Sequence, residues 1–180
     1  MKHILLPTLE QVSKALLMAS YYHSEQRRKY DGSPYVNHLV EVMSLLIDVG
    51  GITSADTLCA AILHDALEDT SLSAQVVEQE FNAHVRQLIC NLTDDKELAL
   101  EERRKVVINK LRFAQHESKC IKLADLCSNI ACIPSDWSHD RVMIYVTWLD
   151  EVALLCKDAN LSLFGEYQQR RYAAFRKYLQ

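Results

Sequence analysis

The chain has 180 residues, of which 49% are hydrophobic and 24% are charged. This length and composition suit one domain with a sizeable core and exclude a disordered or fibrous protein. The net charge of −4 argues against a nucleic-acid binder, which usually carries a basic excess. With only 4 glycines and 3 prolines, long helices are favoured over a many-turned β-sandwich. We therefore expect a single domain over residues 1–180 and no nucleic-acid partner.

The N-terminal apolar run is cut short by Pro7. It is too brief for the core of a signal peptide, and no stretch approaches the length of a membrane span. Six cysteines lie at helix-like apolar positions without a CxxC pair: Cys59, Cys90, Cys120, Cys127, Cys132 and Cys156. This pattern indicates reduced core thiols rather than disulfides or zinc ligands. We expect a cytoplasmic protein with no membrane partner.

Helical periodicity predicts an all-α protein, because no convincing period-2 strand occurs. Thr8 and Gln11 form a possible capping box that opens a first helix reaching about Lys29. A turn cluster follows over 30–34. A second helix is expected at about 35–49, a third from 53 or 54 to 68, and a short one from 71 or 73 to 81, followed by another that ends at about 92. The remaining expected helices span about 97–113, 119–133, 138–158 and 160–178.

The motif HDALED ends the third predicted helix and combines a histidine with acidic side chains. At about 100° per residue, His64, Asp65 and Glu68 would share one arc of this helix. Glu68 and Asp69 alone would suit a solvated helix end, but the apolar pair directly before the motif implies burial. A buried carboxylate costs several kcal/mol unless it is paired or bound to a metal.

Two other predicted helices carry polar residues on apolar faces. His38 lies in line with an apolar stripe, and Asp125 stacks one turn before Asn129 in an otherwise apolar helix. A histidine on a buried face is more often a hydrogen-bonded core residue, and Lys122, one turn from Asp125, is a possible counter-ion. Taken together with His64, the pattern favours a shared divalent metal.

The predicted metal ligands are His38, His64, Asp65 and Asp125. Two imidazoles and two carboxylates suit Mn²⁺, Fe²⁺ or Zn²⁺ better than Ca²⁺, because nitrogen ligands are borderline-soft. Four protein ligands in an open octahedral site leave room for water. A metal lowers the pKa of such a water and provides hydroxide near neutral pH.

These residues resemble the pattern of HD-domain metal-dependent phosphohydrolases: one histidine, a His-Asp doublet and a distant aspartate. The strings HSEQRRKYDGSPYVNH, AAILHDALEDT, TDDK, KLADLCSN and WSHDRVMIYVTW follow in the order seen in the hydrolase domain of the RelA/SpoT family. The resemblance spans about residues 9–165 and is strongest to the single-domain small alarmone hydrolases. It implies an HD-domain helical bundle with a buried metal site. Because the chain ends at Gln180, we expect no synthetase or regulatory domain to follow.

That family removes the 3′-pyrophosphate of (p)ppGpp in a Mn²⁺-dependent reaction. The resemblance therefore implies one Mn²⁺ per chain and a small purine nucleotide as substrate. It assigns Glu68 and Asp69 to positioning or activating the attacking water. The implied substrate contacts are Arg28 and Lys29 at the base, Tyr35 and Asn129 on the nucleotide, and Lys96 and Arg141 on the phosphate side.

The sequence departs from the family pattern at Leu126, where Arg or Lys is usual, and at Ala131 and Cys132, where polar residues are common. Two polar side chains near the nucleotide are therefore missing, which leaves guanine and adenine alarmones both open. The alternatives are an HD-domain phosphohydrolase acting on another nucleotide and a degenerate nucleotide-binding sensor. The sequence leaves the oligomeric state open.

Overall fold

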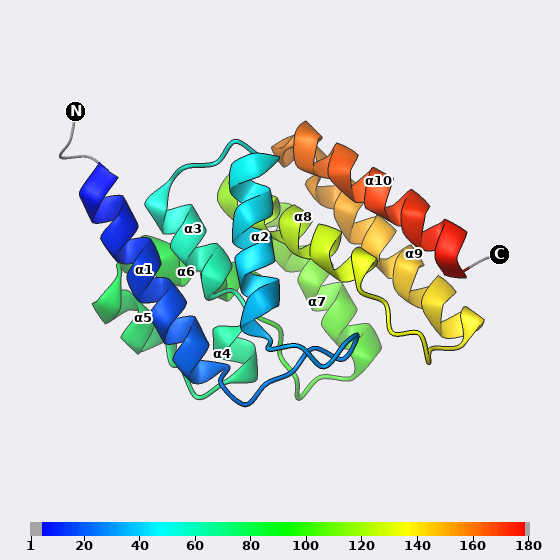
Figure 1. Cartoon of the computed structure of the whole chain (residues 1–180), viewed down its shortest axis with the longest axis horizontal. Coiled ribbons are helices and arrows are strands. Elements are labelled where there is room, and N and C mark those ends of the chain that lie inside the picture. Colours follow the sequence, from blue (N-terminus) through cyan, green and yellow to red (C-terminus); the bar gives the residue numbers. More distant parts are fainter. Residues whose placement is uncertain (1–4, 179–180) are drawn as a thin grey trace.

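The computed structural model describes residues 5–178, with their side chains from residue 9 onwards. Helix α8 (His116–Ala131) lies near the middle of the bundle (Figure 1). Ten of its residues are buried, among them the polar Ser118, Asp125 and Ser128. A helix enclosed on most sides is apolar around most of its circumference. The helices that pack against α8 include α2 (Val36–Asp48), α6 (Ala83–Leu92), α9 (His139–Cys156) and α10 (Leu161–Tyr178).

The remaining helices complete an all-α fold, as predicted. Within residues 5–178 the structure has no strand beyond one isolated bridge, between Arg27 and Pro34. No helix in this range is both long enough and apolar enough to cross a membrane. The other helices are α1 (Leu5–Tyr22), α3 (Ala55–Ile62), α4 (Ala66–Asp69), α5 (Ala74–Glu80), α7 (Leu100–Phe113) and the short η1 (Lys157–Ala159).

Local capping explains several helix starts. Ser54, Ser73, Asn82 and Ser138 each accept a hydrogen bond from a backbone N–H of the first turn. Such caps satisfy donors that have no partner within the helix. Several predicted boundaries shift by about one turn or less: α7 begins at Leu100 rather than at 97, and α8 spans 116–131 rather than 119–133.

The prediction that the first helix reaches Lys29 is wrong, because α1 ends at Tyr22. The segment that follows folds back on itself. The Arg28 N–H donates to Ser33 O at 2.8 Å, and the Tyr35 N–H donates to Gln26 O at 3.0 Å. Gly32 adopts a φ of 72° in the intervening turn, which a residue without a Cβ permits. The basic residues of QRRK therefore lie on a loop and not at a helix end.

The prediction of one continuous helix to Glu68 is also wrong. α3 ends at Ile62, the chain breaks from a regular helix at Leu63, and α4 begins at Ala66. The His64 Nδ1–H donates to the Ala61 carbonyl at 2.8 Å and so satisfies one acceptor next to the break. His64 and Asp65 thus lie within the break and do not share a helix face with Glu68.

The prediction of core thiols holds for four of the six cysteines, whereas Cys90 and Cys132 are only partly buried. All six are free, and four of them are buried: Cys59, Cys120, Cys127 and Cys156. Burial raises the pKa of all four thiols, to about 11 for Cys120. A thiol held in the protonated form is a poor nucleophile, so these four residues serve as core packing.

Because α8 is packed against several helices, we expect a cavity at one of its buried positions to lower the free energy of unfolding strongly. Leu123 is fully buried, and we expect Leu123→Ala to lower the free energy of unfolding by about 2–5 kcal/mol. Leu154 on α9 is 57% exposed, so Leu154→Ala is the matched control, with an expected change within about 0.5 kcal/mol. Urea unfolding of both variants measures the difference, and equal losses would contradict this assignment of the core.

Candidate metal centre

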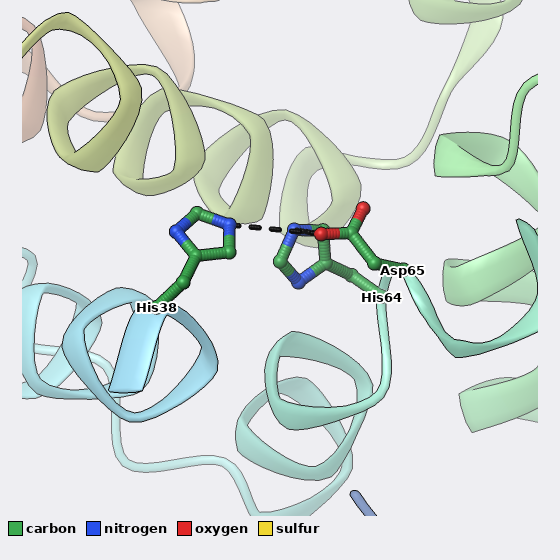
Figure 2. Close-up of side chains that lie close together, drawn as sticks. All are labelled: His38, His64 and Asp65. Atoms are coloured by element: carbon green, nitrogen blue, oxygen red, sulfur yellow. Dashed lines mark ion pairs between the residues drawn. The ribbon is translucent and has the colours of Figure 1, made fainter. Parts of the chain in front are cut away.

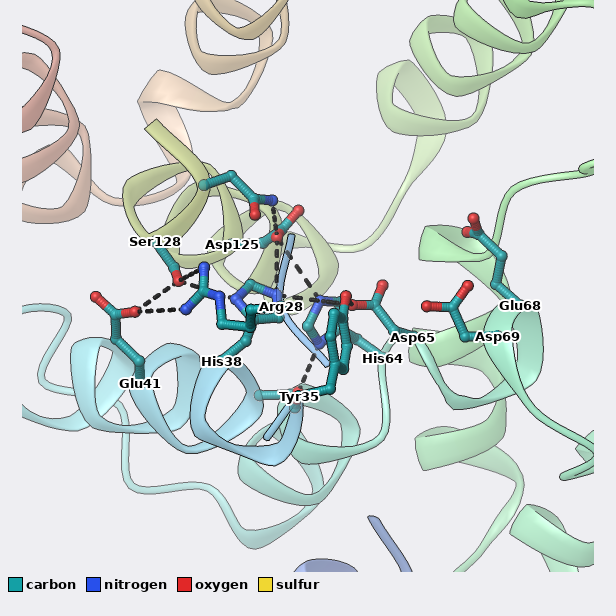
Figure 3. A network of polar contacts seen from close by, with 12 residues as sticks. Arg28, Tyr35, His38, Glu41, His64, Asp65, Glu68, Asp69, Asp125 and Ser128 are labelled. Carbon is teal, nitrogen blue, oxygen red and sulfur yellow. Dashed lines mark hydrogen bonds and ion pairs between the residues drawn. The ribbon is translucent and has the colours of Figure 1, made fainter. Parts of the chain in front are cut away.

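Four side chains from three elements converge at the centre of the bundle (Figure 3), and Figure 2 shows three of them, His38, His64 and Asp65. His38 comes from α2, His64 and Asp65 from the α3–α4 break, and Asp125 from α8. Asp65 Oδ2 lies 3.6 Å from His38 Nε2 and 3.2 Å from His64 Nε2. Asp125 Oδ1 lies 3.3 Å and 3.8 Å from the same two nitrogens. The structure therefore brings all four predicted metal ligands together.

Hydrogen bonds on the far side of each imidazole determine which nitrogen faces this cluster. The His64 Nδ1 must carry a proton, because the Ala61 carbonyl at 2.8 Å only accepts. The His38 Nδ1 donates to Ser128 Oγ at 2.8 Å, and Ser128 in turn donates to Glu41 Oε2 at 2.6 Å. Both Nε2 atoms therefore face the carboxylates, and each can bind a metal ion once it has lost its proton.

These two Nε2 atoms provide the test of whether a metal fits. Both are buried and have no hydrogen-bond partner among the described residues. Buried polar atoms are normally satisfied, and a divalent cation shared with Asp65 and Asp125 would satisfy both nitrogens. The donor set of two nitrogens and two carboxylates suits a divalent transition metal. The residues therefore fit a metal ion.

The cluster also attracts positive charge. Burial alone would lower the pKa of His64, but the carboxylates of Asp65 and Asp125 outweigh it and raise this pKa to about 10. Burial alone would raise the pKa of Asp125, but Lys122 and the two imidazoles hold it well below its ordinary value. A site that favours ionised carboxylates beside neutral or protonated imidazoles also favours a bound cation.

Asp125 is held from both sides. Lys122 Nζ pairs with its Oδ2 at 2.9 Å, and Asn129 Nδ2 donates to its Oδ1 at 2.5 Å. Lys122 is thus the counter-ion that the sequence allows. Because Lys122 engages Oδ2 while Oδ1 faces the histidines, the ion pair and a metal site are compatible. Asn129, predicted as a nucleotide contact, also orients Asp125, a predicted metal ligand.

Two residues that hold the His38 ring in place, Ser128 and Glu41, are not predicted from the sequence. Glu41 accepts from Ser128 and also pairs with Arg28 at 3.4 Å and with Arg170 of α10 at 2.6 Å. Ser128 follows Asp125 by three residues, so it lies on the same face of α8. That spacing is the one sequence signal that could have identified it. Glu41 is 87 positions from Ser128 in the chain and carries no comparable signal.

A cleft of about 430 Å³ opens beside His38. Five of the six predicted substrate contacts line it: Arg28, Lys29, Tyr35, Lys96 and Asn129. Aromatic and other side chains that the sequence analysis leaves unassigned complete its wall: Gln26, Tyr30, Cys132, Trp137 and Tyr145. Basic and aromatic side chains around one cleft suit a polyanion that carries an aromatic ring.

The sixth predicted contact, Arg141, lies outside this cleft. Its guanidinium stacks on the Trp137 ring at 3.9 Å and borders a neighbouring hollow. Trp137 stands between the two spaces and lines both. The structure therefore places Arg141 behind the cleft wall.

Tyr35 has two contacts in the site. Its hydroxyl donates to Asp65 Oδ2 at 2.6 Å, and its ring lines the cleft. Burial and the nearby Asp65 carboxylate raise the pKa of this phenol far above its usual value, so it remains a hydrogen-bond donor. Tyr35 thereby connects the cleft to a predicted metal ligand.

The two predicted catalytic acids extend from α4 on the far side of Asp65 from His38 (Figure 3). Asp69 lines the cleft, pairs with Lys96 and accepts from Gln26 Nε2 at 2.7 Å. Glu68 borders a separate hollow and accepts the Asp94 N–H at 3.0 Å. Burial and neighbouring carboxylates, including Asp94, raise the pKa of Glu68.

Comparison with known proteins agrees with this geometry. The HD domain family matches residues 15–133. A mouse protein, guanosine-3′,5′-bis(diphosphate) 3′-pyrophosphohydrolase MESH1, is 37% identical over 158 residues, which cover 85% of this chain and 88% of that protein. The human protein of the same name is also 37% identical, with the same coverage.

A solved structure described as a metazoan orthologue of SpoT that hydrolyses ppGpp superimposes with a TM-score of 0.82 at 32% identity. The match covers 93% of this chain and 94% of that one. A Listeria monocytogenes structure matches with a TM-score of 0.68 at 25% identity, covering 82% of this chain and 99% of that one. These matches confirm the resemblance to RelA/SpoT-type hydrolases.

The two imidazole Nε2 atoms without a hydrogen-bond partner predict that loss of a histidine of this cluster weakens metal binding. We expect the purified protein to bind about one Mn²⁺ per chain, and His64→Ala to weaken this binding because it removes one ligand. Exposed His139 provides the control variant, His139→Ala. Isothermal titration with Mn²⁺ measures both, and full Mn²⁺ affinity in His64→Ala would contradict the site.

Proposed function

This chain belongs to the HD-domain family, and on that premise we propose that it is a hydrolase that removes the 3′-pyrophosphate of (p)ppGpp-type purine alarmones. The products are pyrophosphate and a 5′-phosphorylated nucleotide. The observation that carries the proposal is the pair of buried, unpartnered imidazole nitrogens facing two carboxylates at the floor of a basic and aromatic cleft. The activity named for the mouse and human relatives supports the same substrate class.

The proposed cofactor is one Mn²⁺ per chain, held by His38, His64, Asp65 and Asp125. When bound, such an ion lowers the pKa of a coordinated water and polarises a phosphoryl oxygen. The chain itself orients the four ligands: Ser128 and Ala61 hold the imidazoles, Tyr35 holds Asp65, and Asn129 with Lys122 holds Asp125. All five contacts are 2.5–2.9 Å long.

Glu68 and Asp69 are the proposed groups that position or activate the attacking water. Asp69 reaches the cleft directly. Glu68 has a raised pKa because of its burial, and a carboxyl whose pKa approaches the working pH exchanges protons more readily. In this proposal Glu68 acts from the α4 side of the site.

The cleft supplies positive charge for the substrate despite the net charge of −4. Arg28, Lys29 and Lys96 line it, and a local basic field of this kind attracts a polyanion. The Arg28 side chain lines the cleft, is about nine-tenths buried and pairs with Glu41, and a guanidinium plane is suited to stacking on a purine. Arg141 supports this wall from behind through Trp137.

Base selectivity is proposed to be loose. Cys132 lines the cleft where a polar residue is common in the family, and Ala131 is exposed and outside the cleft lining. A pocket without a paired hydrogen-bonding group discriminates related substrates only weakly. Guanine and adenine alarmones are therefore both proposed substrates.

A substrate panel with Mn²⁺ tests the proposal. We expect similar kcat/KM values for ppGpp and ppApp, pyrophosphate as the released product by chromatography, and loss of turnover when the metal is chelated. Strict preference for one base would contradict the loose pocket and leave the reaction intact. Orthophosphate as the sole product, or no cleavage of either compound, would favour an HD-domain hydrolase for another nucleotide.

Substitution of the buried acid tests its role. Glu68→Gln keeps the shape of the side chain but removes its proton exchange, so we expect kcat to fall about 100-fold, the usual scale of general acid–base catalysis. Mn²⁺ affinity should stay at the wild-type value, since Glu68 is not a proposed ligand. Exposed Glu97 provides the control, Glu97→Gln. Normal turnover of Glu68→Gln would show that this residue only accepts the hydrogen bond from the Asp94 N–H and takes no part in the reaction.

A further inference from the structure

A third buried histidine lies next to the site without being part of the metal cluster. His23 is 2% exposed and directly follows α1. Its ring stacks on Tyr35, with centroids 5.2 Å apart and an interplanar angle of 26°. Its Nδ1 lies 2.5 Å from Gln26 Oε1, and its buried Nε2 has no partner among the described residues. The metal chemistry proposed above does not use this residue.

The hydrogen bonds of Gln26 permit one amide orientation. Its Nε2 donates to Asp69 Oδ2 at 2.7 Å, while its Oε1 accepts from His23. The opposite orientation would place the Gln26 oxygen against the Asp69 carboxylate, with two acceptors and no proton between them. The His23 Nδ1 must therefore carry a proton, and that proton selects the orientation in which Gln26 donates to Asp69.

We propose that His23 and Gln26 are positioning residues of the hydrolytic site: His23 orients the Gln26 amide, and Gln26 holds the Asp69 carboxylate at the cleft. The inference rests on the proposed function, because it assumes that Asp69 acts on the attacking water. It gives roles to two residues of the HSEQRRK motif that are neither predicted metal ligands nor predicted substrate contacts.

Lys96 alone would hold Asp69 poorly during turnover. Lys96 pairs with the other carboxylate oxygen of Asp69, but its side chain is 49% exposed and lines the cleft. The phosphates of a polyanionic substrate compete for this ammonium group. The Gln26 amide is neutral and tied to a buried histidine, so phosphates draw it less strongly. Gln26 therefore keeps Asp69 in place when a substrate engages Lys96.

Two substitutions at His23 separate orientation from packing. His23→Phe keeps an aromatic ring against Tyr35 but removes the Nδ1 donor. His23→Asn removes the ring but places its Nδ2 near the position of the imidazole Nδ1. We expect His23→Phe to lower kcat on ppGpp about tenfold, the lower end of effects for outer-shell partners, with KM and Mn²⁺ affinity unchanged. His23→Asn should recover most of the lost turnover.

Gln26→Met should give the same roughly tenfold loss of kcat, and exposed Gln87 on α6 provides the control Gln87→Met. In an Asp69→Asn background, Gln26→Met should cause no further loss, because two residues that act through one group are not additive. The inference is wrong if His23→Phe turns over at least as fast as His23→Asn. It is also wrong if the losses from Gln26→Met and Asp69→Asn multiply.

The outcomes distinguish this inference from the proposed function. Full turnover of Asp69→Asn would overturn the role of Asp69, and the inference with it. A slow Asp69→Asn variant combined with a fully active Gln26→Met variant would overturn the inference alone. The imidazole ¹⁵N shifts of His23 need no substrate: we expect a proton on Nδ1. A ring without a proton on Nδ1 would overturn the orientation of Gln26 whatever the substrate.

Discussion

The burial of two carboxylates beside two imidazoles is the constraint on which the rest of this structure depends. Asp125 is itself buried and sits on α8, ten of whose residues are buried, and an unpaired charge there would cost several kcal/mol. Lys122, Asn129 and both imidazoles approach it from different directions. The helices around α8 therefore pack about a charged centre, and their positions are limited by the need to compensate it.

Departures from regular helix occur where this centre needs them. The break between α3 and α4 presents His64 and Asp65, neighbours in sequence, to the same point in space. The loop after α1 brings His23, Gln26 and Arg28 alongside them. In a continuous helix, the side chains of residues 64 and 65 would point in directions about 100° apart. Local irregularity here is part of the construction of the site.

The sequence predicts the helices and the four ligands better than it predicts these irregular segments. His38 and Asp125 stand out because each is polar on an apolar helical face, a signal that periodicity detects. The break at Leu63 has no such signal, since HDALED suits a helix and the break is held by contacts such as Tyr35 with Asp65. The Ser128–Glu41 contact joins residues 87 positions apart, which local pattern does not reveal.

The site divides into a floor built on helices and a rim built on loops. The predicted ligands His38 and Asp125 lie on helices and belong to the floor, whereas Arg28, Cys132 and Trp137 lie on the segments 23–35 and 132–137 outside the helices. Loops accept sequence change more readily than packed helices. A change of substrate preference can therefore come from substitutions in these loop segments, and in the loop that carries Lys96, without repacking the helices that hold the floor.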